Sequence, residues 1–273
     1  MANIVKYEFK NSRLYDIENE MLICDLFYST RISKIIQFES WAIGFLLISK
    51  AVREDKSLFN EYTKSDHRKK IMESLDTSLK AFDYTKQYQL ELFEKAYLDL
   101  YQAFEHFILD CYRSIFCTYP KLIRLFNEKI NIEYNPDDKA FKIYNEDNVN
   151  DSIDDTLEKF SRSKSIIELI ETLNKLPVEI NLSDRDSQQI MKFSKNRNLL
   201  IHNDGRISKA FTKKLEQKEI DHDYEIGNYL TRDYLSKVPL NHYKELLDKT
   251  VKYITNKIAS SDSKLRDFNI EFK

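Results

Sequence analysis

Glycine, proline, cysteine and tryptophan are all scarce in this sequence of 273 residues, which has three, four, three and one of them respectively. Because glycine and proline mark most tight turns, their scarcity indicates few turns and long, uninterrupted elements. Three scattered glycines also exclude a phosphate-cradling loop of the P-loop or Rossmann kind. A helical protein without either nucleotide motif is therefore expected.

Other absences narrow the class further. The odd number of cysteines and the lack of a C-x-x-C pair argue against a disulfide framework or a zinc cluster and fit a reducing cytosol. A net charge of −2 gives no overall attraction to nucleic acid, so such a partner needs a local basic patch. No signal peptide is apparent, and the longest apolar run, 41–49, is too short to span a bilayer. We expect a soluble cytoplasmic protein without membrane contact, metal or cofactor.

The composition, 42% apolar and 32% charged, is typical of a globular protein, and the apolar residues recur with helical periodicity. Helices are expected over about 16–60 and 65–84, and again in a strongly amphipathic stretch that Pro120 ends. That stretch carries one apolar face: Phe93, Tyr97, Leu100, Phe104, Ile108, Cys111 and Ile115. A short helix through Leu125 follows the proline.

The second half alternates between loop and helix. Residues 131–155 are rich in Asn and Asp and predict a long loop with a short strand pair around Ile132–Tyr134 and Phe141–Tyr144. Helix resumes from about Asp151 until Pro177. A further helix begins after the capping residue Ser183 and stops near Gly205. The region 224–235 suggests a small hairpin, and a last helix carries Tyr243, Leu247, Val251, Ile254 and Ile258.

One locus has clear chemical character, the run Arg197-Asn198-Leu199-Leu200-Ile201-His202. At about 100° per residue, Phe193, Leu200 and Ile201 form an apolar arc with Arg197 in its middle. Asn198 falls at the margin of that arc and His202 just outside it, whereas Lys192, Lys195 and Asn196 fall on the opposite side. A buried arginine is costly unless it is paired or lies at an interface. A histidine in the last helical turn exchanges protons near neutral pH.

The same region is locally basic. Between residues 192 and 214 there are seven lysines and arginines against the single acid Asp204. Such a balance within a near-neutral chain suits a phosphate backbone. The candidate RNA-binding residues are Lys192, Lys195, Arg206 and Lys209. The cluster Asp221-His222-Asp223 lacks a second group at ligand spacing, so no metal site is predicted there.

The string Arg197-Asn198-x-x-x-His202, followed by Asn203-Asp204-Gly205, resembles the signature of the HEPN superfamily of helical ribonucleases and nucleotide-binding domains. The resemblance covers the motif and, loosely, the helical order from about residue 87 to 260. It implies an all-α bundle of HEPN type over 86–262, with 131–150 as a loop insertion. Residues 1–85 would be accessory N-terminal helices and 263–273 a tail.

The resemblance implies metal-independent RNA cleavage by attack of the 2′-hydroxyl on the adjacent phosphate. His202 would be the general acid and base, Arg197 would stabilise the phosphoryl oxygens, and Asn198 would orient His202 or the ribose. An acid from an earlier helix often lies near the motif in this family, and Glu105 is the first candidate, with Asp110 the second. Arg197 and His202 lie about 140° apart on an ideal helix, so they converge only if the helix unwinds near its end or a second copy completes the site. A homodimer with a composite active site is therefore expected.

Three functional interpretations remain open from the sequence. The leading one is a prokaryotic toxin or anti-phage defence effector that cleaves tRNA or other RNA, with a neutralising antitoxin or a sensor protein as a further partner. The second is a non-catalytic HEPN-like module that binds RNA or protein. The third is a purely helical interaction protein in which the motif is accidental.

Overall fold

The computed structural model describes residues 5–7, 17–54, 66, 70, 85–126, 131–135, 140–144 and 149–268. Most of these residues are helical, which confirms the all-α prediction. The helices are α1 (Ile17–Glu54), α4 (Thr85–Thr118), α5 (Val149–Ser163), α6 (Ile166–Leu173), α7 (Asp184–Asn203), α8 (Lys209–Glu216), α9 (Leu230–Asp233), α10 (Leu240–Ala259) and α11 (Asp262–Asp267), with 3₁₀ helices η1 (Pro120–Leu125) and η2 (Leu235–Lys237). The helix expected over 65–84 falls almost entirely outside the described residues.

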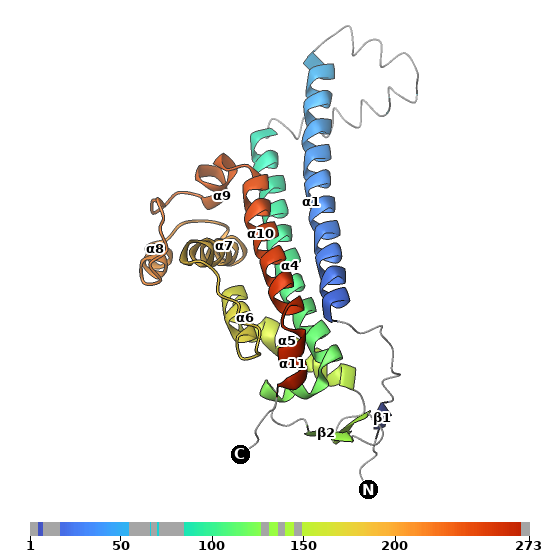
Figure 1. Cartoon of the computed structure of the whole chain (residues 1–273). Coiled ribbons are helices and arrows are strands. Elements are labelled where there is room, and N and C mark those ends of the chain that lie inside the picture. Colours follow the sequence, from blue (N-terminus) through green and yellow to red (C-terminus); the bar gives the residue numbers. More distant parts are fainter. Residues whose placement is uncertain are drawn as a thin grey trace.

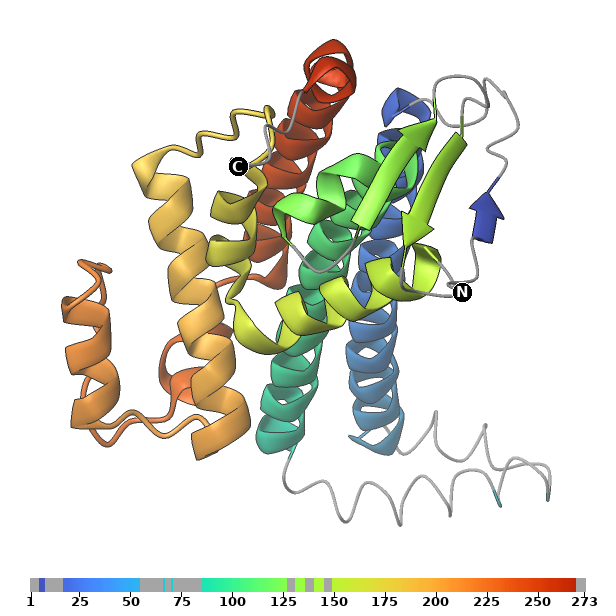
Figure 2. The ribbon, with the colours of Figure 1, turned by 90° about the horizontal axis from the view of Figure 1, so that it is seen from below.

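Three long helices, α1, α4 and α10, lie side by side and form the body of the molecule (Figures 1 and 2). α1 runs antiparallel to α4, because Cys24 bonds Ser114 whereas Arg31 bonds Asp110. The whole apolar stripe predicted for α4 is buried in their shared core. One face of α1 joins that core through Ile17, Met21, Cys24, Tyr28 and Ile32. The first described helix thus packs into the same core as the segment that carries the motif.

α7 crosses this body on the side of α4 opposite to α1. Figure 1 shows α7 almost end-on while α1, α4 and α10 run lengthwise, and α8 lies outside α7. Figure 2 shows the same order from below, with α7 between α8 and α4. The helix α7, which carries the motif, therefore has α4 on one side and α8 on the other.

Two predictions of secondary structure need correction. The single helix expected from about Asp151 until Pro177 is two helices, α5 and α6, because a capping box of Ser165 and Glu168 starts a new helix. The hairpin suggested at 224–235 is wrong, since α9 and η2 occupy residues 230–237. Residues 227–230 pair instead with 205–207, where Ile207 N–H donates to Asn228 O at 2.9 Å and Leu230 N–H donates to Gly205 O at 2.8 Å.

The strand pair expected near 131–144 is confirmed. β2 (Asn131–Asn135) and β3 (Ala140–Tyr144) are antiparallel, and β1 (Val5–Tyr7) pairs with the other edge of β3. Residues 263–267, assigned to the tail, belong to α11 (Asp262–Asp267), which buries Leu265. No helix within the described ranges is long and apolar enough to cross a membrane.

Candidate functional site

The helix α7 has well-defined ends. At its start the Ser183 hydroxyl accepts the Asp186 N–H at 3.1 Å, which confirms the predicted cap. The Lys249 ammonium of α10 bonds the Asp186 carboxylate at 2.8 Å and lowers its pKa. At the other end Asp204 has φ of 48°, and Gly205 N–H donates to Leu199 O at 3.2 Å. These contacts place His202 in the last turn.

The buried face of α7 differs from the predicted arc. Asn196, expected on the polar side, is 2% exposed, whereas Ile201, expected on the apolar arc, is 46% exposed. Asn196 is buried because its amide bonds Tyr97 of α4 and Tyr224 of the segment 220–224, and an isolated helical wheel contains neither partner. Asn196 Nδ2 donates to the Tyr224 hydroxyl at 2.9 Å and to the Tyr97 hydroxyl at 3.4 Å.

Arg197 lies half-buried against α4. Its guanidinium carbon is 5.2 Å from the centre of the Tyr101 ring, a cation–π distance. Its Nη1 donates to Asn198 Oδ1 at 3.0 Å. The Tyr101 hydroxyl is in turn 3.3 Å from Ser194 Oγ, which fixes the ring against α7. Arg197 is thus positioned by an aromatic face and by its neighbour in the motif.

Glu105 follows Tyr101 by one helical turn and is half-buried. Burial raises the pKa of its carboxyl, and the charges of Arg197 and His106 oppose that rise. The interaction with Arg197 is electrostatic, because no ion pair within 4 Å joins them among the described residues. Asp110, the second candidate, lies elsewhere and pairs with Arg31 of α1 at 3.3 Å. Of the two candidate acids, Glu105 is the one near Arg197.

His202 and Asn198 are both exposed. In the part of the chain that the structure describes, no hydrogen bond joins His202 to Arg197 or Asn198. The structure therefore brings Arg197 into contact with Asn198 and close to Glu105, whereas His202 lies at the helix end, one turn after Asn198. The separation of His202 from Arg197 agrees with the angle of about 140° expected from the helical wheel.

The four candidate RNA-binding residues lie in three different places. Arg206 and Lys209 are exposed and line a shallow hollow of about 470 Å³ at the C-terminal end of α7. Lys192 lies on another side of α7, where its Nζ donates to Asp221 O at 2.9 Å. Lys195 is half-buried near Glu168 of α6. The pKa of the Glu168 carboxyl is lowered mainly by the hydrogen bond from Ser165 N–H, and the charge of Lys195 lowers it further. Only Arg206 and Lys209 line the hollow at the end of α7 that carries His202.

Tyr101 is the residue that sequence reasoning missed. The row Tyr97, Tyr101 and Glu105 repeats every four residues and was visible as a pattern on one side of the α4 stripe. The contact of Tyr101 with Arg197, 96 residues later in the sequence, could not be seen in that pattern.

No group of three His, Cys, Asp or Glu side chains suited to a metal occurs in the described ranges. At the Asp221–Asp223 cluster, His222 Nδ1 accepts the Tyr224 N–H at 3.3 Å.

Comparison of the chain with protein-family models, with curated proteins and with solved structures found no match.

Proposed function

We propose that this chain is a metal-independent endoribonuclease of HEPN type, a cytoplasmic prokaryotic toxin or anti-phage defence effector that cleaves tRNA or other RNA. One observation carries the proposal. Arg197 is positioned on Tyr101, bonded to Asn198 and within electrostatic range of Glu105, five residues before an exposed His202 at the helix end. A guanidinium group that binds the phosphate and a histidine that transfers protons are the groups that phosphodiester transfer needs.

In the proposed reaction the ribose 2′-oxygen attacks the adjacent phosphorus and the bond from phosphorus to the 5′-oxygen breaks. A 2′,3′-cyclic phosphate and a free 5′-hydroxyl result. His202 accepts the 2′ proton or donates one to the leaving oxygen, while Arg197 binds the phosphoryl oxygens as their charge grows. Asn198 orients His202 or the ribose, and Glu105 holds the orientation of Arg197 through its charge.

The proposal includes a homodimer. Arg197 and His202 do not meet within one copy, so a facing copy would complete the site with its own motif. α7 lies on the side of α4 away from α1, and its exposed Asn198, Ile201 and His202 provide the surface for this contact. Arg206 and Lys209 would bind the RNA backbone beside it, and an antitoxin or sensor protein would control access.

The decisive experiment is RNA cleavage in EDTA, with total tRNA and a structured RNA as substrates. Wild type is compared with Arg197→Ala and His202→Ala, and Lys252→Ala on the exposed face of α10 serves as control. We expect cyclic-phosphate ends with wild type and the control, and a loss of about 10²- to 10⁴-fold in His202→Ala. Undiminished cleavage in His202→Ala would overturn the proposed role of that residue.

A second candidate function is a non-catalytic module that binds RNA or protein. The observation that favours it is the engagement of Arg197 with Tyr101 and its distance from His202 in the single copy. Wild-type protein that binds RNA in a gel-shift assay, forms no dimer and leaves the RNA intact would support this alternative.

A further inference from the structure

The described residues also line a cavity of about 570 Å³, partly open to solvent, away from the motif. It lies between the first half of α7, residues 220–224, residues 233–238 and the start of α10. None of the residues that line it is Arg197, Asn198, His202 or Glu105. A cavity of this size matches a small-molecule site, and the fold places it on a separate face of α7.

The walls of the cavity are aromatic, and their rings contact one another. Phe193 stacks on Tyr243 with ring centres 5.9 Å apart, and Tyr97 meets Tyr243 edge-on at 5.0 Å. Tyr224 meets Tyr234 edge-on at 4.8 Å. Rings in mutual contact are held rigidly. The two that are half-buried, Tyr234 and Tyr243, therefore offer preformed surfaces on which a planar ligand stacks at little entropic cost.

Polar groups lie between these rings. The Asn196 amide joins the hydroxyls of Tyr97 and Tyr224. Burial raises the pKa of Tyr243 to about 12, so this phenol is neutral at pH 7. Among the described residues its hydroxyl has no hydrogen-bond partner, and neither do the half-buried amides of Gln188 and Gln189. These three unpaired groups are available to the polar edge of a ring.

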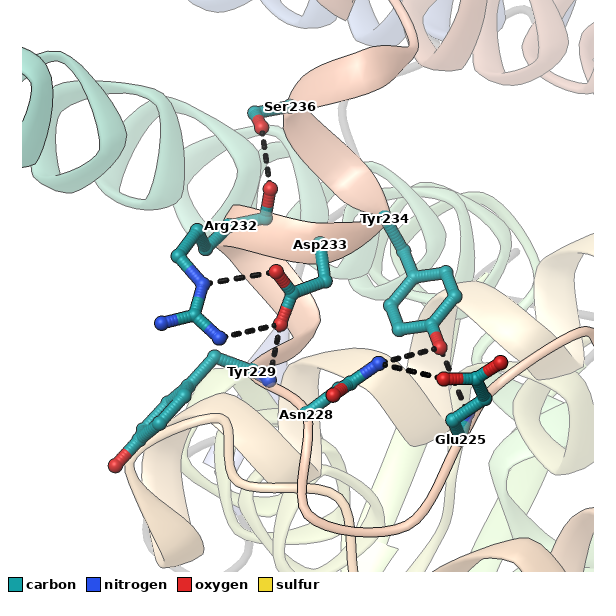
Figure 3. Close-up of polar contacts among 7 residues, drawn as sticks. All are labelled: Glu225, Asn228, Tyr229, Arg232, Asp233, Tyr234 and Ser236. Carbon is teal, nitrogen blue, oxygen red and sulfur yellow. Dashed lines mark hydrogen bonds and ion pairs between the residues drawn. The ribbon is translucent and has the colours of Figure 1, made fainter.

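Cations surround the cavity. Lys192 Nζ lies 5.0 Å from the Tyr224 ring and Lys237 Nζ lies 5.7 Å from the Tyr234 ring, and Arg185 also lines the site. Three acids are present as well, but Arg232 holds Asp233 through two bonds of 2.8 and 2.9 Å (Figure 3). The local excess of positive charge is therefore small and suits one anionic group better than a polyphosphate.

Figure 3 also shows how the Tyr234 wall is held in place. Glu225 N–H donates to the Tyr234 hydroxyl at 2.7 Å, and Asn228 Nδ2 donates to it at 3.2 Å. Asp233 accepts the Tyr229 N–H at 2.7 Å, which fixes the turn into α9. The ring of Tyr234 is thus positioned before any ligand arrives.

We propose that this cavity binds a small molecule that has a planar aromatic ring with a hydrogen-bonding edge and one anionic group. The ring stacks on the half-buried rings of Tyr234 and Tyr243, its polar edge bonds the Tyr243 hydroxyl and a Gln188 or Gln189 amide, and its anionic group meets Lys192 and Lys237. A nucleoside monophosphate and an aromatic carboxylate both have this chemistry. The site is independent of the proposed cleavage chemistry.

The test is isothermal titration calorimetry on full-length His202→Ala protein, so that the proposed cleavage residue plays no part in the signal. The probes are adenosine monophosphate, adenosine, 4-hydroxybenzoate and inorganic phosphate. We expect saturable binding of at least one ring-bearing anion, weaker binding of adenosine and none of phosphate alone. Preference for the nucleotide or for the carboxylate identifies the source of the ligand. Failure of both ring-bearing anions to bind overturns the proposal whatever the outcome of the cleavage assay.

Two conservative variants locate the binding. Tyr243→Phe keeps the ring and removes the hydroxyl, and Lys237→Gln removes one cation, so each should weaken binding about three- to tenfold. Tyr229→Phe and Lys252→Gln are the matched controls outside the cavity. Equal binding by wild type, Tyr243→Phe and Lys237→Gln would place the ligand elsewhere and refute the assignment. Circular dichroism and thermal melting verify that each variant is folded.

Discussion

At the scale of single residues, the position of Arg197 depends on Tyr101. The guanidinium lies over the ring at 5.2 Å, and the Tyr101 hydroxyl is close to Ser194. We predict that Tyr101→Leu lowers cleavage by about tenfold, because loss of the ring removes a contact of roughly 1 kcal/mol and frees the arginine. Tyr101→Phe keeps the aromatic face and should stay within about threefold of wild type. Similar losses in both variants would show that the hydroxyl, rather than the ring, positions the site.

Replacing Glu105 should affect stability and activity in different directions at pH 7. Burial raises the pKa of its carboxyl, so the folded state binds the proton more tightly than the unfolded chain does. Its contribution to stability is therefore present at low pH and declines as pH rises from about 4.3, the ordinary value, through the folded pKa. Glu105→Gln should melt at or above the wild-type temperature at pH 7 and at the wild-type temperature near pH 4. Its cleavage at pH 7 should nevertheless fall.

The control for this prediction is Glu158→Gln, an exposed acid of α5 that bonds Arg162 within its own helix. It should change neither cleavage nor the pH dependence of melting by a measurable amount. A melting temperature of Glu105→Gln clearly below wild type at pH 7 would mean that this carboxylate stabilises the fold through its charge, contrary to the burial argument.

At the scale of elements, the sequence predicted those features that depend on near neighbours. The seven-residue stripe of α4 is fully buried, and the cap at Ser183 forms as its residue type predicts. The break between α5 and α6 was missed, although Ser165 and Glu168 have the spacing of a capping box. The pairing of residues 227–230 with 205–207 could not be predicted, since partners more than 20 residues apart in sequence leave no periodic signal.

The features of the candidate site also fall into two groups, those that depend on local residues and those that depend on how helices pack. The motif in the last turns of α7 and its stop at Gly205 were predicted from local residues. The contacts of Arg197 with α4 were not, because they depend on how two helices cross, which no spacing within either helix specifies. Asn196 illustrates the same limit, since Tyr97 of α4 and Tyr224 bond a buried side chain that an isolated wheel places in solvent.

A substitution at Gly205 tests whether the conformation at the C-terminal end of α7 matters for stability and cleavage. It has φ of 69°, and a Cβ there would lie 3.1 Å from Leu200 Cδ2. We predict that Gly205→Ala destabilises the fold by about 1–2 kcal/mol and lowers cleavage by displacing His202. The matched variant is Gly44→Ala in α1, where nothing lies within 4 Å of the new Cβ. It should stabilise the protein by about 0.5–1 kcal/mol in urea unfolding. Equal effects of the two variants would contradict this account.

At the scale of the whole molecule, α1 determines whether the chain unfolds as one unit. Tyr28 of α1 is 1% exposed and meets Phe107 of α4 edge-on at 5.6 Å, whereas its neighbour Phe27 is 55% exposed. Because α1 shares the core with α4 and α10, we predict that Tyr28→Ala lowers the free energy of unfolding by about 3–5 kcal/mol in a single transition. Phe27→Ala should remain within about 0.5 kcal/mol of wild type. Urea unfolding followed by circular dichroism and by tryptophan fluorescence, which reports on Trp41 in α1, measures both. Two separate transitions, with the tryptophan signal lost first, would show that α1 is instead an independent unit beside the helices that carry the motif.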